Sequence, residues 1–307
     1  MKIAYFGYDP LFSCLEVFLK QGHDFAMIYT GESSQFSNNV IQFAQRNDIP
    51  LCFGQPTLTE MQNLLGLGVE LFFSAEYPWK IPIPAGLKYA INVHPTLLPE
   101  GRGMTPLPQL ILKQSIYAGI TLHKLSNQFD AGDILLQKAV LLDEDETFDS
   151  LSAKIFKQTP ELLFTLLSDF DDYYRNSQAQ GEGSDWASIT ADEQTLDWRQ
   201  PTAALLTTLR AFGSLGTYAD IAGKACVIIY SSASSASSSF LNSKSYPFSQ
   251  QSQSTLAVNG KCYQHNYSAG QVIRSNELHI TIATFNGELC IPNQSILWKL
   301  LDKKPLT

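Results

Sequence analysis

An amide and an imidazole lie one residue apart where an apolar run of this chain ends. Asn92 and His94 fall in the sequence INVHPTLLPEGRG (91–103), which continues into a loop rich in proline and glycine. In a β-strand alternate side chains point to the same face, so both groups should face one side of a sheet. An amide N–H can stabilise a developing oxyanion, and an imidazole can move a proton. The pair is therefore a candidate catalytic site, although a single strand histidine is more often structural.

Two aspartates further along the chain are candidates to complete such a site. Asp130 and Asp133 lie on either side of Gly132 in the sequence QFDAGDIL (128–135), directly before an apolar run. If this loop and the loop after His94 meet at one sheet edge, the Asp130 carboxylate would raise the pKa of the imidazole and orient it. Aspartates beside a glycine also serve as plain turn residues. We expect Asp130 to be functional and Asp133 to be structural.

Short apolar runs alternate with amphipathic runs through the first half, which is typical of an α/β fold. Helices are expected between the early strands at residues 11–22, 38–47 and 59–68. The expected strands are 2–7, 24–30, 49–53, 69–75, 89–94, 119–125 and 133–142. Alternating strands and helices build a mostly parallel, Rossmann-like sheet with helices on both faces. Ligands bind beyond the carboxyl ends of such strands, and Asn92 and His94 lie at one of these ends.

The second half predicts a smaller β domain. Residues 146–174 are expected to form a long helical region interrupted at Pro160, and 176–190 are polar and Gly/Ser-rich, like a linker. A helix at 201–213 precedes short alternating runs, among which residues 231–254 are of low complexity and predict a long loop. We therefore divide the chain into a first domain at 1–175, a linker at 176–190 and a second domain at 191–307.

Composition limits the function classes. The 307 residues carry a formal net charge of −8, which argues against a polyanionic partner. No apolar run approaches the ~20 residues that a membrane span needs. The five cysteines are scattered without a CxxC pair, so neither a disulfide framework nor a metal site is expected, and a reducing cytoplasm fits this pattern.

Four motifs in order resemble the signature of the formyltetrahydrofolate-dependent formyltransferases. They are Asn92-x-His94, LLPxxRG (97–103), GITLH (119–123) and DAGDIL (130–135). The family includes methionyl-tRNA, glycinamide ribonucleotide and sugar N-formyltransferases. Residues 189–224 are similar to the start of the OB-like C-terminal domain of the methionyl-tRNA and aminoarabinose-pathway enzymes. The resemblance implies a Rossmann-like catalytic domain followed by an OB-like domain.

The resemblance also implies a mechanism. N10-formyltetrahydrofolate would donate its formyl group to a primary amine through a tetrahedral intermediate. Asn92 and a protonated His94 would stabilise the oxyanion, and Asp130 would keep the pKa of the imidazole high. His123, in the GITLH motif, is expected to be a structural strand histidine.

Contacts with the folate and the acceptor follow less tightly from the resemblance. Lys80, Ile81 and Pro82 occupy the place of the loop that grips the pterin, although an apolar loop there also fits plain core packing. The other expected folate contacts are Met104, Ser126, Asn127, Gln128, Phe129 and Asp130. Tyr8, Asp9 and Pro10, at the end of the first strand, are expected to border the acceptor pocket.

The sequence departs from the transfer-RNA branch of the family. That branch carries a basic insertion after the second strand, whereas this chain has no Lys or Arg between Lys20 and Arg46. The expected linker of this chain is net acidic as well, and cationic contacts to phosphates dominate nucleic-acid affinity. We expect a nucleotide-linked amino sugar as acceptor, with methionyl-tRNA as the alternative and a non-catalytic binding protein of this fold as a further one. The sequence identifies neither the amine nor the oligomeric state, and a homodimer is compatible with it.

Overall fold

The computed structural model describes residues 1–32, 36–230 and 258–298. The Ser-rich loop expected at 231–254 lies outside the described residues. The chain forms two compact units. The first comprises Met1–Pro106, Ile116–Leu141 and Ser152–Ser188, and the second comprises Leu107–Ser115, Leu142–Leu151 and Ile189–Thr307.

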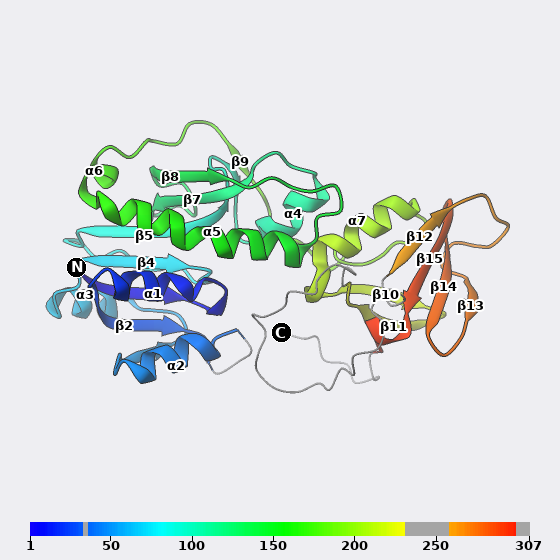
Figure 1. Ribbon diagram of the computed structural model, residues 1–307, viewed down its shortest axis with the longest axis horizontal. Coiled ribbons are helices and arrows are strands. Elements are labelled where there is room, and N and C mark those ends of the chain that lie inside the picture. The colour runs from blue at the N-terminus through cyan, green and yellow to red at the C-terminus, as the bar shows by residue number, and fades with distance from the viewer. Residues whose placement is uncertain (33–35, 231–257, 299–307) are drawn as a thin grey trace. The chain divides into compact units, whose positions relative to one another are not determined.

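A seven-stranded, mostly parallel sheet forms the centre of the first unit (Figure 1). The first five strands in spatial order are mutually parallel, and β7 runs antiparallel to both of its neighbours. The spatial order is β3 (Leu51–Phe53), β2 (Asp24–Thr30), β1 (Lys2–Gly7), β4 (Leu71–Ala75), β5 (Tyr89–Thr96), β7 (Ala118–Lys124) and β8 (Ile134–Ala139). The central strands β1 and β4 are buried on both faces, as in other parallel sheets covered by helices.

Helices cover both faces of this sheet. Phe18 of α1 (Ser13–Lys20) packs edge-on against Phe73, with ring centroids 4.9 Å apart. Met61 of α3 (Leu58–Gly66) belongs to a core cluster with Phe72. Because Phe72 and Phe73 are adjacent on β4, their side chains point to opposite faces, so α1 and α3 lie on opposite sides of the sheet. The first turn of α3 is closed by a capping box between Thr57 and Glu60.

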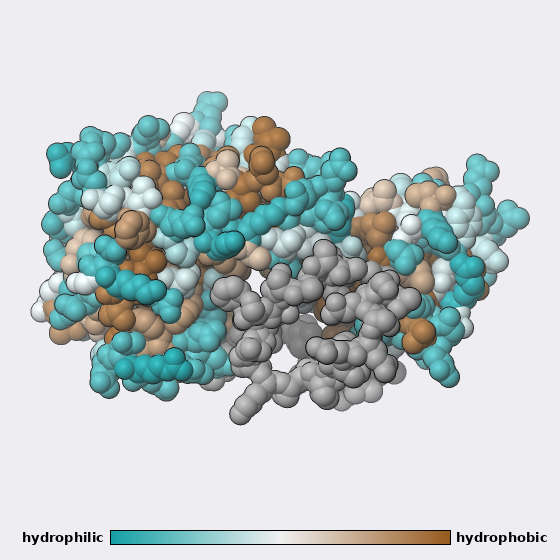
Figure 2. All heavy atoms as spheres, viewed as in Figure 1, coloured by the Kyte–Doolittle hydropathy of each residue, from teal (hydrophilic) through white to brown (hydrophobic). Residues whose placement is uncertain are grey.

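Helix α5 (Phe148–Ser168) runs without a break through Pro160, so the predicted interruption there is wrong. A proline inside a helix removes a backbone hydrogen bond and costs about 3 kcal/mol. Buried residues on both sides of it, Ile155 and Leu163 among them, outweigh that cost by keeping one face of the helix packed. The chain breaks instead at Asp169, before α6 (Phe170–Arg175). Hydrophilic residues cover much of the outward face of α2 (Asn38–Arg46) (Figure 2).

The segment expected to be a linker is ordered over most of its length. Residues 177–186, which we call the return segment, belong to the first unit. Within it, β9 (Ser184–Asp185) pairs in parallel with β6 (Glu100–Arg102), and Gln178 exchanges two backbone hydrogen bonds of 2.8 Å with Ile134. The return segment therefore joins the loop after β5 to the start of β8.

The second unit is a helix on two small antiparallel sheets. Leu205 and Leu209 of α7 (Thr202–Phe212) pack into one core with Ile282, Leu289 and Ile291. One sheet contains β10 (Thr217–Ile221), β11 (Lys224–Ile228) and β16 (Ile296–Trp298); the other contains β12 (Asn259–Cys262), β15 (Gly287–Pro292), β14 (His279–Thr284) and β13 (Val272–Ser275). Helix α4 (Pro106–Leu112), apart from its first residue, also belongs to this unit. Single turns of 3-10 helix lie at Asp9–Leu11, Gly213–Leu215 and Asn293–Ser295.

All five cysteines are free thiols. Among the residues that the structure describes, none of the helices combines the length and the apolar character needed to cross a membrane.

Candidate active site

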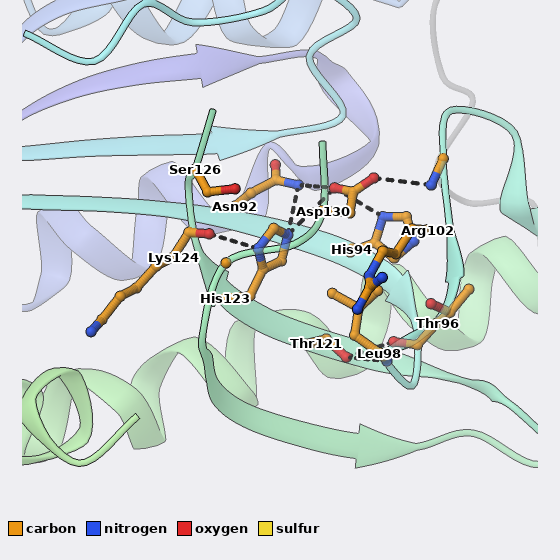
Figure 3. Close-up of polar contacts among 12 residues, drawn as sticks. Asn92, His94, Thr96, Leu98, Arg102, Thr121, His123, Lys124, Ser126 and Asp130 are labelled. Carbon is orange, nitrogen blue, oxygen red and sulfur yellow. Dashed lines mark hydrogen bonds and ion pairs between the residues drawn. The ribbon is translucent and has the colours of Figure 1, made fainter. Parts of the chain in front are cut away.

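Strand pairing in the sheet brings the candidate residues together. Asn92 of β5 lies opposite His123 of β7, and His94 lies opposite Thr121 in the same antiparallel register. Asn92 and His94 therefore occupy one face at the carboxyl end of β5, as the sequence predicts. Asp130 reaches the same place from the loop between β7 and β8 (Figure 3).

The Asp130 carboxylate is the centre of this polar cluster. Its Oδ1 lies 3.2 Å from Asn92 Nδ2, 3.5 Å from His94 Nδ1 and 3.5 Å from His123 Nε2. Its Oδ2 accepts a hydrogen bond of 3.1 Å from the backbone N–H of Gly103. Burial, the largest single influence, would raise the pKa of Asp130, but the neighbouring His123 and His94 rings and the N–H of Gly103 together lower it. Asp130 is therefore an anion at neutral pH.

His94 is almost fully buried, with 4% of its surface exposed. Its Nε2 lies 2.9 Å from the Gly101 carbonyl oxygen, so Nε2 carries a hydrogen and donates it. Burial lowers the pKa of His94, and the Asp130 charge and the Gly101 carbonyl offset this only in part. The sequence-based expectation of a high pKa is therefore wrong, because the loss of water outweighs the nearby carboxylate. In the resting protein the ring is neutral at pH 7, and its Nδ1 faces Asp130 without a hydrogen.

His123 belongs to the cluster, contrary to the expectation that it is only a strand residue. It is 1% exposed, and its Nδ1 donates to the Lys124 carbonyl oxygen at 2.8 Å. A neutral ring with that hydrogen leaves Nε2 as an acceptor, and Asn92 Nδ2 lies 3.2 Å from it. Asn92 thus donates one N–H to His123 and the other to Asp130 (Figure 3). The orientation of the Asn92 amide is set by these two acceptors.

The return segment holds the backbone of the loops that carry these candidate residues. Gln180 Nε2 donates to the carbonyl oxygens of Asp130 and Gly132, at 2.8 and 2.7 Å. Its Oε1 in turn accepts from Arg102 Nε at 2.9 Å. Ser184 Oγ accepts from the N–H of Gly101, the residue whose carbonyl bonds to His94. The loops that carry Asp130 and orient His94 are therefore fixed by a segment more than forty residues away in sequence.

Comparisons with known proteins agree with this geometry. A family profile described as formyl transferase matches residues 68–167, which include Asn92, His94, His123 and Asp130. A methionyl-tRNA formyltransferase of Coprothermobacter proteolyticus is 26% identical over 73% of this chain and 78% of its own length. A formyl transferase domain like that of the formyltetrahydrofolate-dependent formyltransferases therefore lies at residues 68–167. The chain is an N-formyltransferase with formyltetrahydrofolate as its formyl donor, and the alternative of a non-catalytic protein of this fold falls away.

Two solved sugar N-formyltransferases share the fold of this formyltransferase. WlaRD, a sugar 3-N-formyltransferase solved in the presence of dTDP and 5-N-formyl-THF, has a TM-score of 0.62 at 17% identity and matches over 99% of this chain and 98% of its own. The N-formyltransferase from Helicobacter canadensis, solved with folinic acid and dTDP-3-aminofucose, has a TM-score of 0.63 at 16% identity, over 95% and 98% of the two chains. At these identities the likeness establishes the fold.

The residues expected to contact folate lie around the cluster in different environments. Ile81 is buried in the core cluster on the α3 face, so plain packing accounts for it, whereas Lys80 is exposed and Pro82 is partly exposed. Met104 and Phe129 are more than half exposed. Met104 follows Gly103, whose N–H donates to Asp130 Oδ2, and Phe129 directly precedes Asp130. Asn127 and Gln128 are exposed, and Ser126 Oγ donates to the Gln128 carbonyl oxygen at 2.6 Å.

The residues expected to border the acceptor pocket are less uniform. Tyr8 follows β1 directly, and its ring lies 6.5 Å from that of Trp79, in the loop after β4. The Asp9 carboxylate accepts from the backbone N–H groups of Asn39 and Val40, at 3.0 and 2.9 Å. Asp9 therefore caps the start of α2, a structural task that its sequence context did not reveal. Pro10 lies in the short helical turn at Asp9–Leu11.

Replacing Gln180 by leucine should lower kcat by on the order of 10², because a shift of about 1 Å in a catalytic loop has an effect of this size. The change leaves two loop carbonyls without their donor and should move Asp130. Steady-state kinetics with a saturating acceptor would measure it. Gln178→Leu is the matched control, since the Gln178 side chain is exposed on the same segment. A kcat within threefold of the unaltered enzyme would show that the return segment does not position the site.

Proposed function

We propose that this enzyme transfers the formyl group of N10-formyltetrahydrofolate to the primary amine of a nucleotide-linked amino sugar. The observation that carries this acceptor is the run from Gln21 to Gln45, which contains neither Lys nor Arg. The run includes the end of β2, at the same edge of the sheet as the catalytic cluster. A protein that holds transfer RNA there neutralises phosphates with cationic side chains, and those contacts dominate its affinity. A small acceptor needs no such row of cations.

Two relatives favour different acceptors. The Helicobacter canadensis enzyme, which binds dTDP-3-aminofucose, matches almost its whole length to this chain. The Coprothermobacter proteolyticus relative is named for methionyl-tRNA, which is why that acceptor stays the runner-up. The absence of cations in 21–45 favours the sugar.

In the proposed reaction the acceptor nitrogen bonds to the formyl carbon, the bond from that carbon to N10 breaks, and N10 gains a proton. His94 is suited to carry this proton, because its resting ring is neutral and its Nδ1 is free to accept. Once protonated, the ring lies between the Asp130 carboxylate and the Gly101 carbonyl, both of which are in place beforehand. Protonation of His94 therefore requires no rearrangement of the site.

Asn92 is the proposed donor to the negative charge that develops on the formyl oxygen. Both of its N–H groups are bonded in the resting protein, to His123 and to Asp130. The formyl oxygen would replace one of these acceptors as its charge grows. Asn92 thus binds the charged oxygen better than the neutral one, and this difference accelerates the reaction.

The proposed donor site is bordered by the loop at 80–82 and by the residues from Ser126 to Asp130. Met104 and Phe129 are exposed apolar side chains next to the charged cluster. They suit a folate, because its flat rings can pack on apolar side chains while its reactive nitrogen lies at the cluster. Tyr8 is the proposed boundary with the acceptor.

Acceptor preference is the direct test. With N10-formyltetrahydrofolate as donor, we expect kcat/KM for dTDP-3-aminofucose or a related 3- or 4-amino sugar nucleotide to exceed that for charged initiator transfer RNA at least about a hundredfold, since the missing phosphate contacts are worth 10³ or more in affinity. Release of tetrahydrofolate measures both reactions. Equal efficiencies, or a preference for the transfer RNA, would make methionyl-tRNA the acceptor.

A further inference from the structure

Glu76 is a second carboxyl group at the catalytic end of the sheet. It directly follows β4, whose Ser74 and Ala75 lie opposite Asn92 and Val93 of β5. Its backbone is left-handed, with φ of 58°, and Asp130 is left-handed as well, with φ of 52°. Residues other than glycine rarely adopt this conformation. The surrounding structure therefore holds both acidic residues in an unfavourable backbone conformation.

The Glu76 carboxylate differs from that of Asp130 in having no partner. Asp130 accepts hydrogen bonds from Asn92 and the Gly103 N–H and lies 3.5 Å from two imidazoles, whereas in the described part of the chain no hydrogen bond or ion pair is found for the Glu76 side chain. The titratable groups that interact with it electrostatically are the Asp130 carboxylate, from the loop before β8, and the Tyr5 hydroxyl, from β1. Burial and then the Asp130 charge raise the pKa of Glu76 to about 7. A partly buried carboxylate next to another anion is unfavourable until a cation arrives.

We propose that Glu76 binds the acceptor as its ammonium ion and removes one proton from it before formyl transfer. This inference rests on the proposed transfer to an amine. The ammonium gives one proton to the Glu76 carboxylate, which frees the nitrogen lone pair to attack the formyl carbon. The bond to N10 then breaks, N10 takes the second nitrogen proton through His94, and the third stays on the formamide. Glu76 finally releases its proton to water, so one proton leaves per turnover.

Replacing Glu76 by glutamine tests this step. The change keeps the size of the side chain, removes the base, and should lower kcat/KM for dTDP-3-aminofucose by on the order of 10² at pH 7, as expected for a lost general base. The loss should shrink to less than about tenfold at pH 9, where the acceptor reaches the site already neutral. The acidic limb of the kcat/KM profile should move from near pH 7 towards the pKa of the acceptor amine. Affinity for folinic acid should not change.

Glu70→Gln is the matched control, because Glu70 is an exposed carboxylate that flanks the opposite end of β4 and lies 4.0 Å from Lys88. It removes the same charge and should leave the pH profile unaltered. An E76Q profile that parallels the unaltered enzyme from pH 6 to 9 would overturn the role of Glu76 alone. If the unaltered enzyme formylates no amine, the proposed function is overturned and this step with it.

Thermal unfolding separates catalysis from structure. Because the folded-state pKa of Glu76 is raised, the stability that this carboxyl contributes is present below about pH 4.5 and is lost as the pH rises through 7. E76Q should therefore have a higher Tm than the unaltered protein at pH 8 and the same Tm near pH 4.5. A more stable but slower enzyme supports the proposal, since a merely structural Glu76 would lose stability on substitution. A lower Tm at pH 8 would contradict it.

Discussion

Replacing Asp130 by asparagine is expected to lower kcat about a thousandfold, within the 10²–10⁴ range of proton-transfer catalysis. The substitution keeps the shape of the side chain and removes the only carboxylate that lies within 3.5 Å of both His94 and His123 in the described structure. Without that anion, burial would lower the pKa of His94 further, and the ring would accept a proton less readily. Steady-state turnover and folinic acid binding, measured on the same preparation, would separate loss of chemistry from loss of donor affinity.

Asp133→Asn is the matched control for that experiment. Asp133 lies in the same turn, but its carboxylate bonds to Lys124 and Ser177, away from the imidazoles. Its substitution should change kcat less than about threefold, since side chains outside such networks contribute little. An Asp130→Asn enzyme that kept a tenth of the original turnover would rule out the proposed role of the carboxylate.

Replacing Gly132 by alanine is expected to destabilise the protein by on the order of 3 kcal/mol, because forced overpacking against backbone has a cost of this size. A Cβ atom at this position would lie 1.9 Å from the Lys124 carbonyl oxygen. That oxygen accepts the hydrogen bond from His123 Nδ1, so relief of the clash must also displace the histidine. We therefore expect activity and stability to fall together.

Urea unfolding at a constant m-value would measure the change in the free energy of unfolding. Gly66→Ala is the control, because a Cβ on Gly66, at the end of α3, meets no atom within 4 Å. That substitution should be neutral or slightly stabilising. A Gly132→Ala protein as stable as the control would mean that the turn and β7 can move apart at little cost.

The sequence alone predicts the strands and helices of the first unit because their cues are local. Alternation placed Asn92 and His94 on one face, and the order of elements placed that face at the carboxyl edge of the sheet. Asp130 followed from its position directly before a strand. These inferences depend on residues close together in the chain.

What the sequence could not predict depends on residues far apart in the chain. His123 joins the cluster through the antiparallel register of β5 and β7, which no local pattern encodes. Gln180 lies in a polar, glycine-containing stretch typical of a linker, and its two bonds to the Asp130 loop are visible in three dimensions alone. The pKa of His94 depends on the balance between burial and charge, and sequence supplies only the charge. Pro160 stays helical because its neighbours are packed on both sides.

The order of strands across the sheet has a consequence for synthesis on the ribosome. Strand β1, in the interior of the sheet, emerges first, and β2 and β4 then add on either side of it. Domains generally fold from the N-terminus during translation, so each later strand can join an edge that already exists. The return segment emerges after all seven strands of that sheet, yet it holds the Asp130 loop and the Gly101 N–H. A nascent chain released at Arg175 would thus have all seven strands of the sheet, while the loops of the candidate active site would still lack their contacts with the return segment.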